Sequence, residues 1–156
     1  MHRTLSSALS TLAFLSISGC QSAPAPLTPA DVDAQRVLSE SFRDRVLAKD
    51  WDAVSQMYAD SAIFMPPNSP PLRGRAAIRE WLGAFPPVAT FTVIDDGVVG
   101  AGDLVYTYGR YTMTLGLPGS PVDSGKYLDI RRKQKDGSWK YEADMFNTSV
   151  PLPPTP

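Results

Sequence analysis

The sequence predicts an α+β fold, in which a curved antiparallel sheet forms a half-barrel wrapped around three N-terminal helices. Apolar residues recur at spacings of three and four over residues 34–46 and 78–85, which is the period of an amphipathic helix. From residue 90 onward, segments rich in β-branched and aromatic residues alternate with glycine-containing turns, which is typical of consecutive strands. Helices followed by a run of strands favour an α+β layout over alternating βα units.

The first 19 residues have the character of an export signal. Residues 5–17 are apolar and small, and this segment is shorter than the roughly 20 residues of a transmembrane helix. It leads into Leu15-Ser16-Ile17-Ser18-Gly19-Cys20, which resembles the lipobox of a bacterial lipoprotein signal peptide. The resemblance implies that residues 1–19 are removed and that Cys20, the only cysteine, carries acyl chains such as palmitate on a membrane. The alternative is an ordinary secretory signal in which this cysteine has no role.

The residue after the cysteine bears on the expected location. It is Gln21 rather than aspartate, and by resemblance to enterobacterial sorting rules this favours the periplasmic face of the outer membrane. Residues 20–29 are rich in proline and alanine, and we expect a lipidated, flexible tether there. Residues 30–149 would form one domain, and the proline-rich residues 150–156 would form an extended tail.

The first two helices have clear start signals. Thr28 is suited to the N-cap, Pro29 to the first helical position, and Asp31 to the acidic position of a capping box. An apolar stripe follows, formed by Ala34, Val37, Leu38, Phe42 and Val46. Asp50 then caps a second, short helix that contains Trp51 and Val54.

The third helix lies between two proline-rich segments. A short strand is expected over residues 61–65, and residues 66–71 form a loop with four prolines. Gly74 leads into a helix whose apolar face carries Ile78, Trp81, Leu82 and Phe85. Pro86-Pro87 ends this helix, because proline removes a backbone donor and restricts the residue before it.

The remaining chain predicts the sheet. A strand over residues 90–94 is followed by expected turns at Asp96-Gly97 and Gly102-Asp103, and then by a long strand over residues 104–115. After a wide loop, residues 126–134 and 138–148 should form a hairpin through Asp136-Gly137, which is a strong turn signal. A sheet that packs on helices along one face curls, and the open end of the curl is a natural pocket.

Composition excludes several kinds of function. The formal net charge of −1 gives no concentrated basic surface of the kind that binds nucleic acid. His2 is the only histidine, and it lies in the segment expected to be removed. The mature chain would lack imidazole and a free thiol, so we expect no catalytic triad, no cysteine nucleophile, and no metal or other cofactor. Any catalysis would use carboxylate, phenol, amide or amine groups, and whether the protein is an enzyme stays open.

Several motifs together resemble the SnoaL-like, nuclear transport factor 2-like superfamily, whose members include ketosteroid isomerases and polyketide cyclases. They are Asp50-Trp51-Asp52-Ala53, Met57-Tyr58-Ala59-Asp60-Ser61-Ala62, Met65-Pro66-Pro67, Leu72-Arg73-Gly74-Arg75-Ala76-Ala77-Ile78, Gly102-Asp103-Leu104-Val105-Tyr106, Gly125-Lys126-Tyr127-Leu128, Asp136-Gly137-Ser138-Trp139-Lys140 and Asp144-Met145-Phe146-Asn147. The resemblance covers residues 34–149. It implies a cone-shaped half-barrel and a homodimer formed through the convex face of the sheet.

Strand alternation and the resemblance predict the pocket. Lys126 alternates with Leu128 and Ile130, so we expect it on an apolar, inward face, with a solvated lysine as the alternative. The resemblance places Thr107, Gly109 and Tyr111 toward the cavity, with Gly109 making room, and an acid and an amide, Asp144 and Asn147, near its floor. Alternation alone puts Asp144 outside, unless a β-bulge lies between Glu142 and Asp144.

Three functions stay open at this point. The first is a lipid-anchored envelope protein that binds a small, largely apolar molecule, with Met65, Trp81 and Tyr111 as walls and Lys126, Asp144 and Asn147 as polar contacts. The second is an isomerase, dehydratase or cyclase that uses Asp144 as a general base, since a buried acid beside aromatic residues has a raised pKa. The third is a dimerisation or scaffold module, in which Asp144 is a structural acid.

Overall fold

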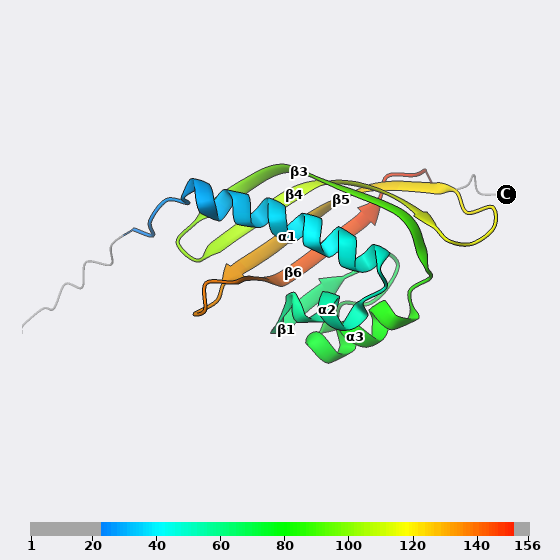
Figure 1. The fold of residues 1–156 in the computed structure, drawn as a ribbon, viewed down its shortest axis with the longest axis horizontal. Helices are drawn as coiled ribbons and strands as arrows, with labels where there is room; N and C mark the ends of the chain where they lie inside the picture. The colour runs from blue at the N-terminus through cyan, green and yellow to red at the C-terminus, as the bar shows by residue number, and fades with distance from the viewer. Residues whose placement is uncertain (1–22, 152–156) are drawn as a thin grey trace, which may run out of the picture.

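The computed structural model describes residues 23–151, which form three helices and a six-stranded curved sheet (Figure 1). The expected signal peptide, Cys20 and the end of the proline-rich tail lie outside these residues. The helices are α1 (Pro29–Leu47), α2 (Trp51–Gln56) and α3 (Arg75–Ala84). The strands are β1 (Tyr58–Met65), β2 (Leu72–Arg73), β3 (Val88–Ala101), β4 (Leu104–Leu115), β5 (Val122–Lys133) and β6 (Trp139–Thr148). The predicted α+β class is confirmed.

The helices begin where the sequence predicts. The Thr28 side chain accepts from the Asp31 backbone, and the Asp31 carboxylate accepts from the Thr28 backbone, so both halves of the capping box form. The Asp50 carboxylate accepts from the backbone of Ala53 at the start of α2. Lys49 has φ of 58°, a left-handed conformation that separates the two helices.

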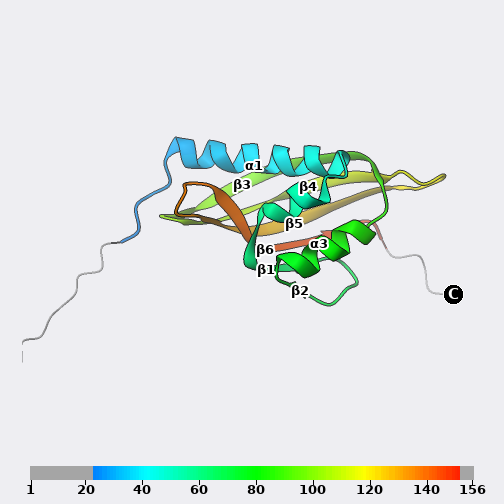
Figure 2. The ribbon, with the colours of Figure 1, turned by 60° about the horizontal axis from the view of Figure 1, so that its bottom comes forward.

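The strands lie in the order β2-β1-β6-β5-β4-β3. Neighbouring strands are antiparallel except β1 and β6, which are parallel. Helix α1 lies across one face of the sheet, while α2 and α3 pack together near β1 (Figures 1 and 2). We call the face toward α1 the inner face and the opposite one the outer face. The curved sheet does not close into a barrel, because β2 and β3 remain at its edges.

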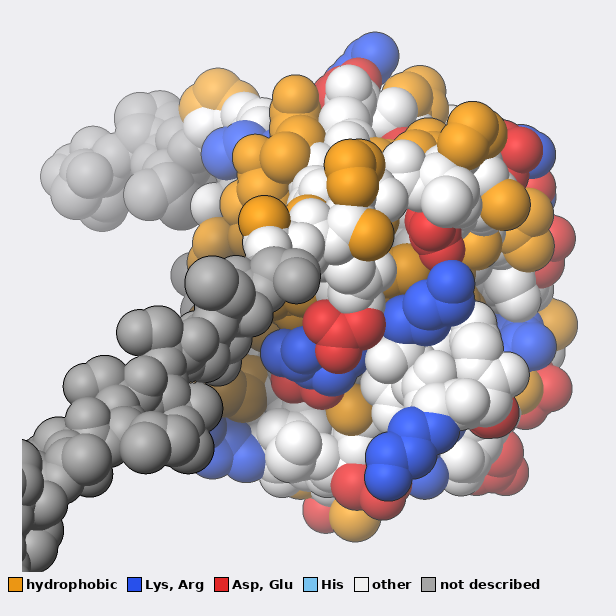
Figure 3. Space-filling view, turned by 90° about the vertical axis from the view of Figure 1, so that its left-hand side faces the viewer, with side chains coloured by type: hydrophobic (Ala, Val, Ile, Leu, Met, Phe, Trp, Pro, Cys, Tyr) orange, Lys and Arg blue, Asp and Glu red, His pale blue; other side chains and the backbone are white. Residues whose placement is uncertain are grey.

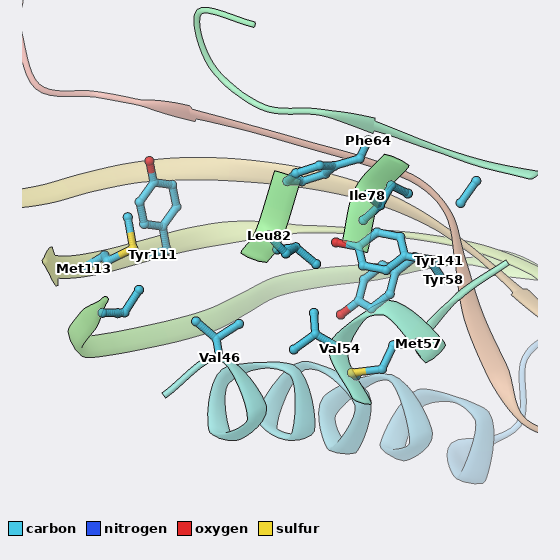
Figure 4. Close-up of a cluster of buried hydrophobic side chains, with 12 residues drawn as sticks. Val46, Val54, Met57, Tyr58, Phe64, Ile78, Leu82, Tyr111, Met113 and Tyr141 are labelled. Carbon is cyan, nitrogen blue, oxygen red and sulfur yellow. The ribbon is translucent and has the colours of Figure 1, made fainter. Parts of the chain in front are cut away.

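One apolar cluster joins the helices to the inner face. Figure 4 shows Val46 of α1 and Val54 of α2 facing the aromatic side chains of the sheet. The buried members of the cluster are Val46, Val54, Met57, Tyr58, Ala62, Phe64, Ile78, Leu82, Val88, Tyr111, Met113 and Tyr141.

The inner side of α1 differs from the predicted apolar stripe. Val37 is 54% exposed, whereas Asp31, Gln35 and Ser39 are buried. These polar residues lie four positions apart and therefore form one line along the helix. The prediction for Val37 was wrong because the first half of α1 packs on polar side chains of the sheet rather than on apolar ones.

Two strand irregularities decide which side chains face inward. The expected turn at Asp96-Gly97 was wrong: β3 continues through it, and Asp96 is an extra residue between the pairs Asp95–Gly109 and Gly97–Tyr108. On β6 a bulge is present, at Glu142, directly before the segment in which a bulge would bring Asp144 inward. Ile130 pairs with Ala143 and Arg131 with Tyr141, which leaves Glu142 as the extra residue. Tyr141 and Asp144 consequently both face inward.

The end of the molecule where α1 begins also holds the chain that precedes it. Ala25 accepts a hydrogen bond from the backbone N–H of Gly102 at 2.7 Å, and Pro26 forms a bridge with Ala101. Lysine and arginine side chains lie beside aspartate and glutamate on this face (Figure 3). Within residues 23–151, no helix is both long and apolar enough to span a bilayer.

Candidate ligand cavity and its buried carboxyl pair

A partly enclosed cavity of about 90 Å³ lies between the inner face of the sheet and the three helices. Most of its wall is aromatic. Phe64 lies 5.1 Å from Trp81 and 5.9 Å from Phe146, and Trp81 lies 5.0 Å from Phe85, measured between ring centroids. The lining residues are Ser39, Phe42, Val46, Trp51, Phe64, Trp81, Leu82, Phe85, Phe91, Val93, Tyr111, Met113, Tyr127, Asp129, Arg131, Tyr141, Asp144 and Phe146.

The polar end of the cavity is built on β5 and β6. Asp129 and Asp144 are directly opposite one another in the ladder, and they are only 4% and 7% exposed. Asp129 accepts from Arg131 Nη2 at 2.9 Å. Asp144 accepts from the hydroxyl of Tyr58 at 2.5 Å. Two buried carboxyls therefore face each other, and one of them has a cationic partner.

Each of the two carboxyls disfavours the charged form of the other. Burial raises the pKa of Asp144 well above its ordinary value, and the negative charge of Asp129 raises it further. Burial also raises the pKa of Asp129, but Arg131 opposes this shift. Asp144 is accordingly the member of the pair that more strongly favours its protonated form. Burial likewise raises the pKa of Tyr58, which keeps this phenol neutral.

Arg131 ties the polar end to α1. Its Nη1 donates to the backbone carbonyl of Gln35 at 2.9 Å, and its Nη2 donates to Ser39 Oγ at 2.8 Å as well as to Asp129. Ser39 in turn donates to Asp95 at 2.9 Å. The guanidinium also lies 4.8 Å from the ring centroid of Tyr141. Both terminal nitrogens of Arg131 are thus committed to neighbouring groups.

Tyr141 presents a free hydroxyl at the same end. Its side chain is 3% exposed and its ring lies 5.1 Å from that of Tyr58, with which it is drawn side by side in Figure 4. Burial raises the pKa of Tyr141, so its hydroxyl is neutral. None of the side-chain hydrogen bonds found within residues 23–151 involves this hydroxyl, which leaves it able to bond to a ligand.

The predicted pocket residues divide into two groups. Trp81, Tyr111 and Asp144 line the cavity, whereas Met65, Lys126 and Asn147 do not. Lys126 and Asn147 are opposite one another on the exposed outer face, where Lys126 Nζ lies 3.4 Å from Ser149 Oγ.

The prediction for Lys126 was wrong because β5 is turned over relative to the expected orientation. Leu128 and Ile130 are 41% and 37% exposed, while Asp129 and Arg131 are buried and satisfy one another. Met65 fails for a simpler reason: its neighbour Phe64 takes the inward position on β1.

Sequence reasoning missed Tyr58, Asp129 and Arg131 as site residues. A signal was present, because Asp129 and Arg131 alternate with apolar residues on β5 while Gln35 and Ser39 are one helical turn apart. Two polar rows of complementary chemistry indicate a buried polar contact between helix and strand. Among residues 23–151, no group of three or more histidine, cysteine, aspartate and glutamate side chains is placed to hold a metal ion.

Comparisons with known proteins agree on the fold. A ketosteroid isomerase-like protein from Erwinia carotovora atroseptica is 18% identical, covers 80% of this chain and 100% of its own, and superposes with a TM-score of 0.71. A protein of unknown function from Mycobacterium tuberculosis is 19% identical over 80% of each chain, with a TM-score of 0.72. A nuclear transport factor 2-like protein of unknown function from Pseudomonas putida is 18% identical over 81% of this chain and 99% of its own, with a TM-score of 0.69.

At these identities the structural likeness establishes the fold alone. No curated protein matches the chain. The family model described as the SnoaL-like domain matches residues 39–142, from within α1 to within β6. The match includes Asp129 and ends just before Asp144. The chain therefore belongs to the SnoaL-like domain family.

Proposed function

We propose that this protein binds a small, largely apolar molecule in the cavity between α1, α3 and the inner face of the sheet. The observation that carries the proposal is a cavity with aromatic walls that ends in buried polar groups, among them the unpartnered hydroxyl of Tyr141. Ligand sites in proteins commonly combine an apolar lining with a few convergent polar groups. SnoaL-like folds, to which the family match assigns the chain, often bind small hydrophobic ligands.

The volume limits the size of the ligand. A dry cavity of about 150 Å³ in another protein holds benzene, and this one measures about 90 Å³. A ligand that fits without rearrangement is therefore small, or it extends past the half-buried Trp81 and Phe85 toward solvent.

Tryptophan fluorescence and native mass spectrometry test the binding. Trp51 and Trp81 line the cavity, so a ligand that enters it should change their emission and add a defined mass to the protein. Val93→Phe places a ring in the cavity and should abolish both signals. Val37→Phe, on the exposed side of α1, is the matched control and should leave them intact. Binding that is unaffected by Val93→Phe would rule out this cavity as the site.

The burial and raised pKa of Asp144 favour a second candidate, an isomerase, dehydratase or cyclase that uses this carboxyl for proton transfer. A carboxyl with a raised pKa at the end of an apolar cavity is suited to general acid–base catalysis. Asp144→Asn keeps the shape of the side chain and removes its proton transfer. Under the enzyme hypothesis this variant loses turnover but keeps substrate binding, and a variant that retains full turnover excludes the role of Asp144.

The proposed setting of this function is the cell envelope, at the periplasmic face of the outer membrane, with Cys20 as the acylated anchor. The lipobox-like segment at residues 15–20 supports this proposal. Cys20→Ser should keep the unprocessed mass, carry no acyl chains and be absent from the outer-membrane fraction. If wild type and variant have the same mass and the same distribution, the anchor is disproved.

The homodimer expected from the family is also a proposal, and the outer face of the sheet supports it. Two rows of side chains cross four strands there, and the exposed apolar residues among them are Val99, Tyr106, Tyr108, Leu128, Ile130 and Met145. We call this set the outer apolar patch.

A further inference from the structure

Among residues 23–151, the buried carboxyl of Asp144 has no cationic partner. Asp129 has Arg131 as its partner, and Asp95 accepts from Ser39 and Tyr127. Asp144 accepts only from the neutral phenol of Tyr58, and within residues 23–151 no lysine or arginine forms an ion pair with it. If Asp144 loses its proton, its charge is buried and its nearest cation already serves Asp129.

The neighbouring cations cannot readily move to Asp144. Both terminal nitrogens of Arg131 bond to Gln35, Ser39 and Asp129. Lys133, the next cation on the inner side of β5, pairs with Asp31 at 2.8 Å. Among the described residues no cation is free to pair with a charged Asp144, so a ligand would have to supply the counter-ion of its carboxylate.

The groups around Asp144 are those that receive an ammonium ion. The carboxyl and the unpartnered hydroxyl of Tyr141 both supply acceptor oxygens for N–H donors. The faces of aromatic rings attract cations, and Arg131 already packs over Tyr141 in this way. An anionic ligand would instead meet two carboxyl groups, Asp129 and Asp144, of which Asp129 is already charged.

We propose that the ligand of this cavity is a small organic cation, with an ammonium group directed at Asp144 and Tyr141 and an apolar or aromatic body against the aromatic walls. This inference rests on the proposed binding of a small, largely apolar molecule and specifies the charge of that molecule. A neutral ligand would use the walls and leave Asp144 in its protonated form.

Proton balance gives the proposal a distinctive signature. Free Asp144 holds a proton, and the bound ammonium stabilises its carboxylate, so binding releases one proton from Asp144 to solvent while the ammonium keeps its own. Affinity for the cation should rise with pH, by up to about tenfold per unit, as long as free Asp144 is protonated. The charged or titratable groups facing Asp144 are Tyr58 of β1, Asp129 and Arg131 of β5, and Tyr141 of β6, with Asp95 of β3 more distant.

Three probes that share a phenyl ring and differ in charge distinguish the contribution of charge to affinity from that of the apolar body. They are benzylammonium, benzyl alcohol and benzoate. Titration calorimetry would use the full chain carrying Cys20→Ser, which removes the acylation site so that no acyl chain competes for the cavity. Measurements between about pH 6 and about pH 8 stay below the ordinary pKa of an alkylamine, about 10.4 for lysine. Repeating them in two buffers of different ionisation enthalpy counts the protons released.

We expect benzylammonium to bind at least about tenfold more tightly than benzyl alcohol, which corresponds to about 1.4 kcal/mol, and benzoate to bind most weakly. Binding of benzylammonium should strengthen with pH and release a proton. Asp144→Asn should reduce the preference for the cation to within about twofold and keep the affinity for benzyl alcohol. Asp123→Asn, an acid outside the cavity, is the matched control and should keep the preference.

The outcomes separate this inference from the proposal it rests on. If benzyl alcohol or benzoate binds as tightly as benzylammonium, or if no proton is released, the organic cation is excluded while apolar ligand binding stands. If none of the three probes binds, the proposed ligand binding fails for molecules of this size, and the inference fails with it. Should Asp144→Asn not fold, the pH dependence and the proton release of the parent chain decide the question by themselves.

Discussion

At the scale of the residue, Asp144 combines deep burial with a carboxyl neighbour, and both disfavour its charged form. The folded chain therefore binds a proton at Asp144 more tightly than the unfolded chain does. This tighter proton binding stabilises the folded chain fully below the pKa of an unfolded aspartate, about 3.9. The stabilisation is lost as the pH rises through the higher folded-state pKa of Asp144.

Asp144→Asn should reveal this contribution. Asparagine does not titrate, so the free energy of unfolding of the wild type relative to the variant should decrease as pH rises above about 4, by at most about 1.4 kcal/mol per unit. Urea denaturation over a pH series measures it. Asp136→Asn is the control of opposite sign, because hydrogen bonds from Ser138 lower the pKa of Asp136 and its contribution is lost only in acid. Parallel stability curves for wild type and Asp144→Asn would contradict the raised pKa of Asp144.

Gly109 is a second residue whose identity follows from the site. A Cβ atom there would lie 2.0 Å from the carbonyl oxygen of Ile94 and 2.7 Å from the hydroxyl of Tyr127, which donates to Asp95. Gly109→Ala should lower the free energy of unfolding by about 1–3 kcal/mol, as overpacking does. Gly116→Ala is the control, since its Cβ would meet Pro87 at an ordinary 3.4 Å. Equal unfolding temperatures for the two variants would refute the steric argument.

At the scale of the element, α1 is attached to the sheet by two different kinds of contact. Its second half packs through Phe42 and Val46 onto the apolar cluster. Its first half binds through polar groups, with Arg131 at the centre, and two atoms in this layer, Gln35 Oε1 and Arg131 Nε, have no partner. The attachment of the first half therefore depends on one guanidinium.

Arg131→Met tests this dependence. It leaves the charge of Asp129 buried without a partner, which typically costs about 3–5 kcal/mol in the free energy of unfolding. Lys133→Met removes the more exposed contact of the same strand with α1 and should cost much less. Adding Asp129→Asn to Arg131→Met should restore part of the loss, because no unpaired charge remains. Denaturant titrations compare the variants, and equal losses for Arg131→Met and Lys133→Met would disprove the central role of Arg131.

Elements that depend on local chemistry are predicted well from the sequence, whereas orientations that depend on tertiary contacts are not. Helix starts at Thr28 and Asp50 and the hairpin at Asp136-Gly137 depend on local backbone chemistry, and the structure contains them. The orientation of β5 depends on what covers each face. Its apolar residues, Leu128 and Ile130, lie on the outer face because Asp129 and Arg131 satisfy each other inside. Alternation identifies the two faces of a strand but does not say which is buried.

For the candidate site, the sequence indicates the cavity residues that are large and aromatic or that stand at a family position. It does not indicate residues whose burial depends on a partner from another element. Trp81 and Tyr111 are large aromatic residues on the inner side of their elements, and Asp144 reaches the cavity through the bulge at Glu142. Asp129 and Arg131 look like ordinary surface charges until α1 supplies Gln35 and Ser39 opposite them.

At the scale of the whole molecule, the covered face of the sheet carries charged side chains and the exposed face carries apolar ones, the reverse of the usual arrangement. The inner face holds a charged network beside the aromatic cavity, and the outer face holds the outer apolar patch. On this patch Tyr106 and Tyr108 stack with ring centroids 6.3 Å apart. A contiguous exposed apolar patch marks an interaction surface, and a second copy of the chain would present the same patch in a two-fold symmetric contact.

Leu128→Glu tests whether this patch forms the dimer. Leu128 lies in the row Gly97, Tyr108, Leu128 and Met145, so a glutamate there would place two like charges in a two-fold interface and remove apolar contact from both copies. We expect a dimeric wild type and a monomeric variant by sedimentation equilibrium. Val37→Glu makes the same kind of change on the exposed side of α1 and should stay dimeric. A monomeric wild type would disprove the dimer. A dimeric Leu128→Glu would place the contact away from the outer apolar patch, because burying an unpaired glutamate costs more free energy than a surface contact of this kind can supply.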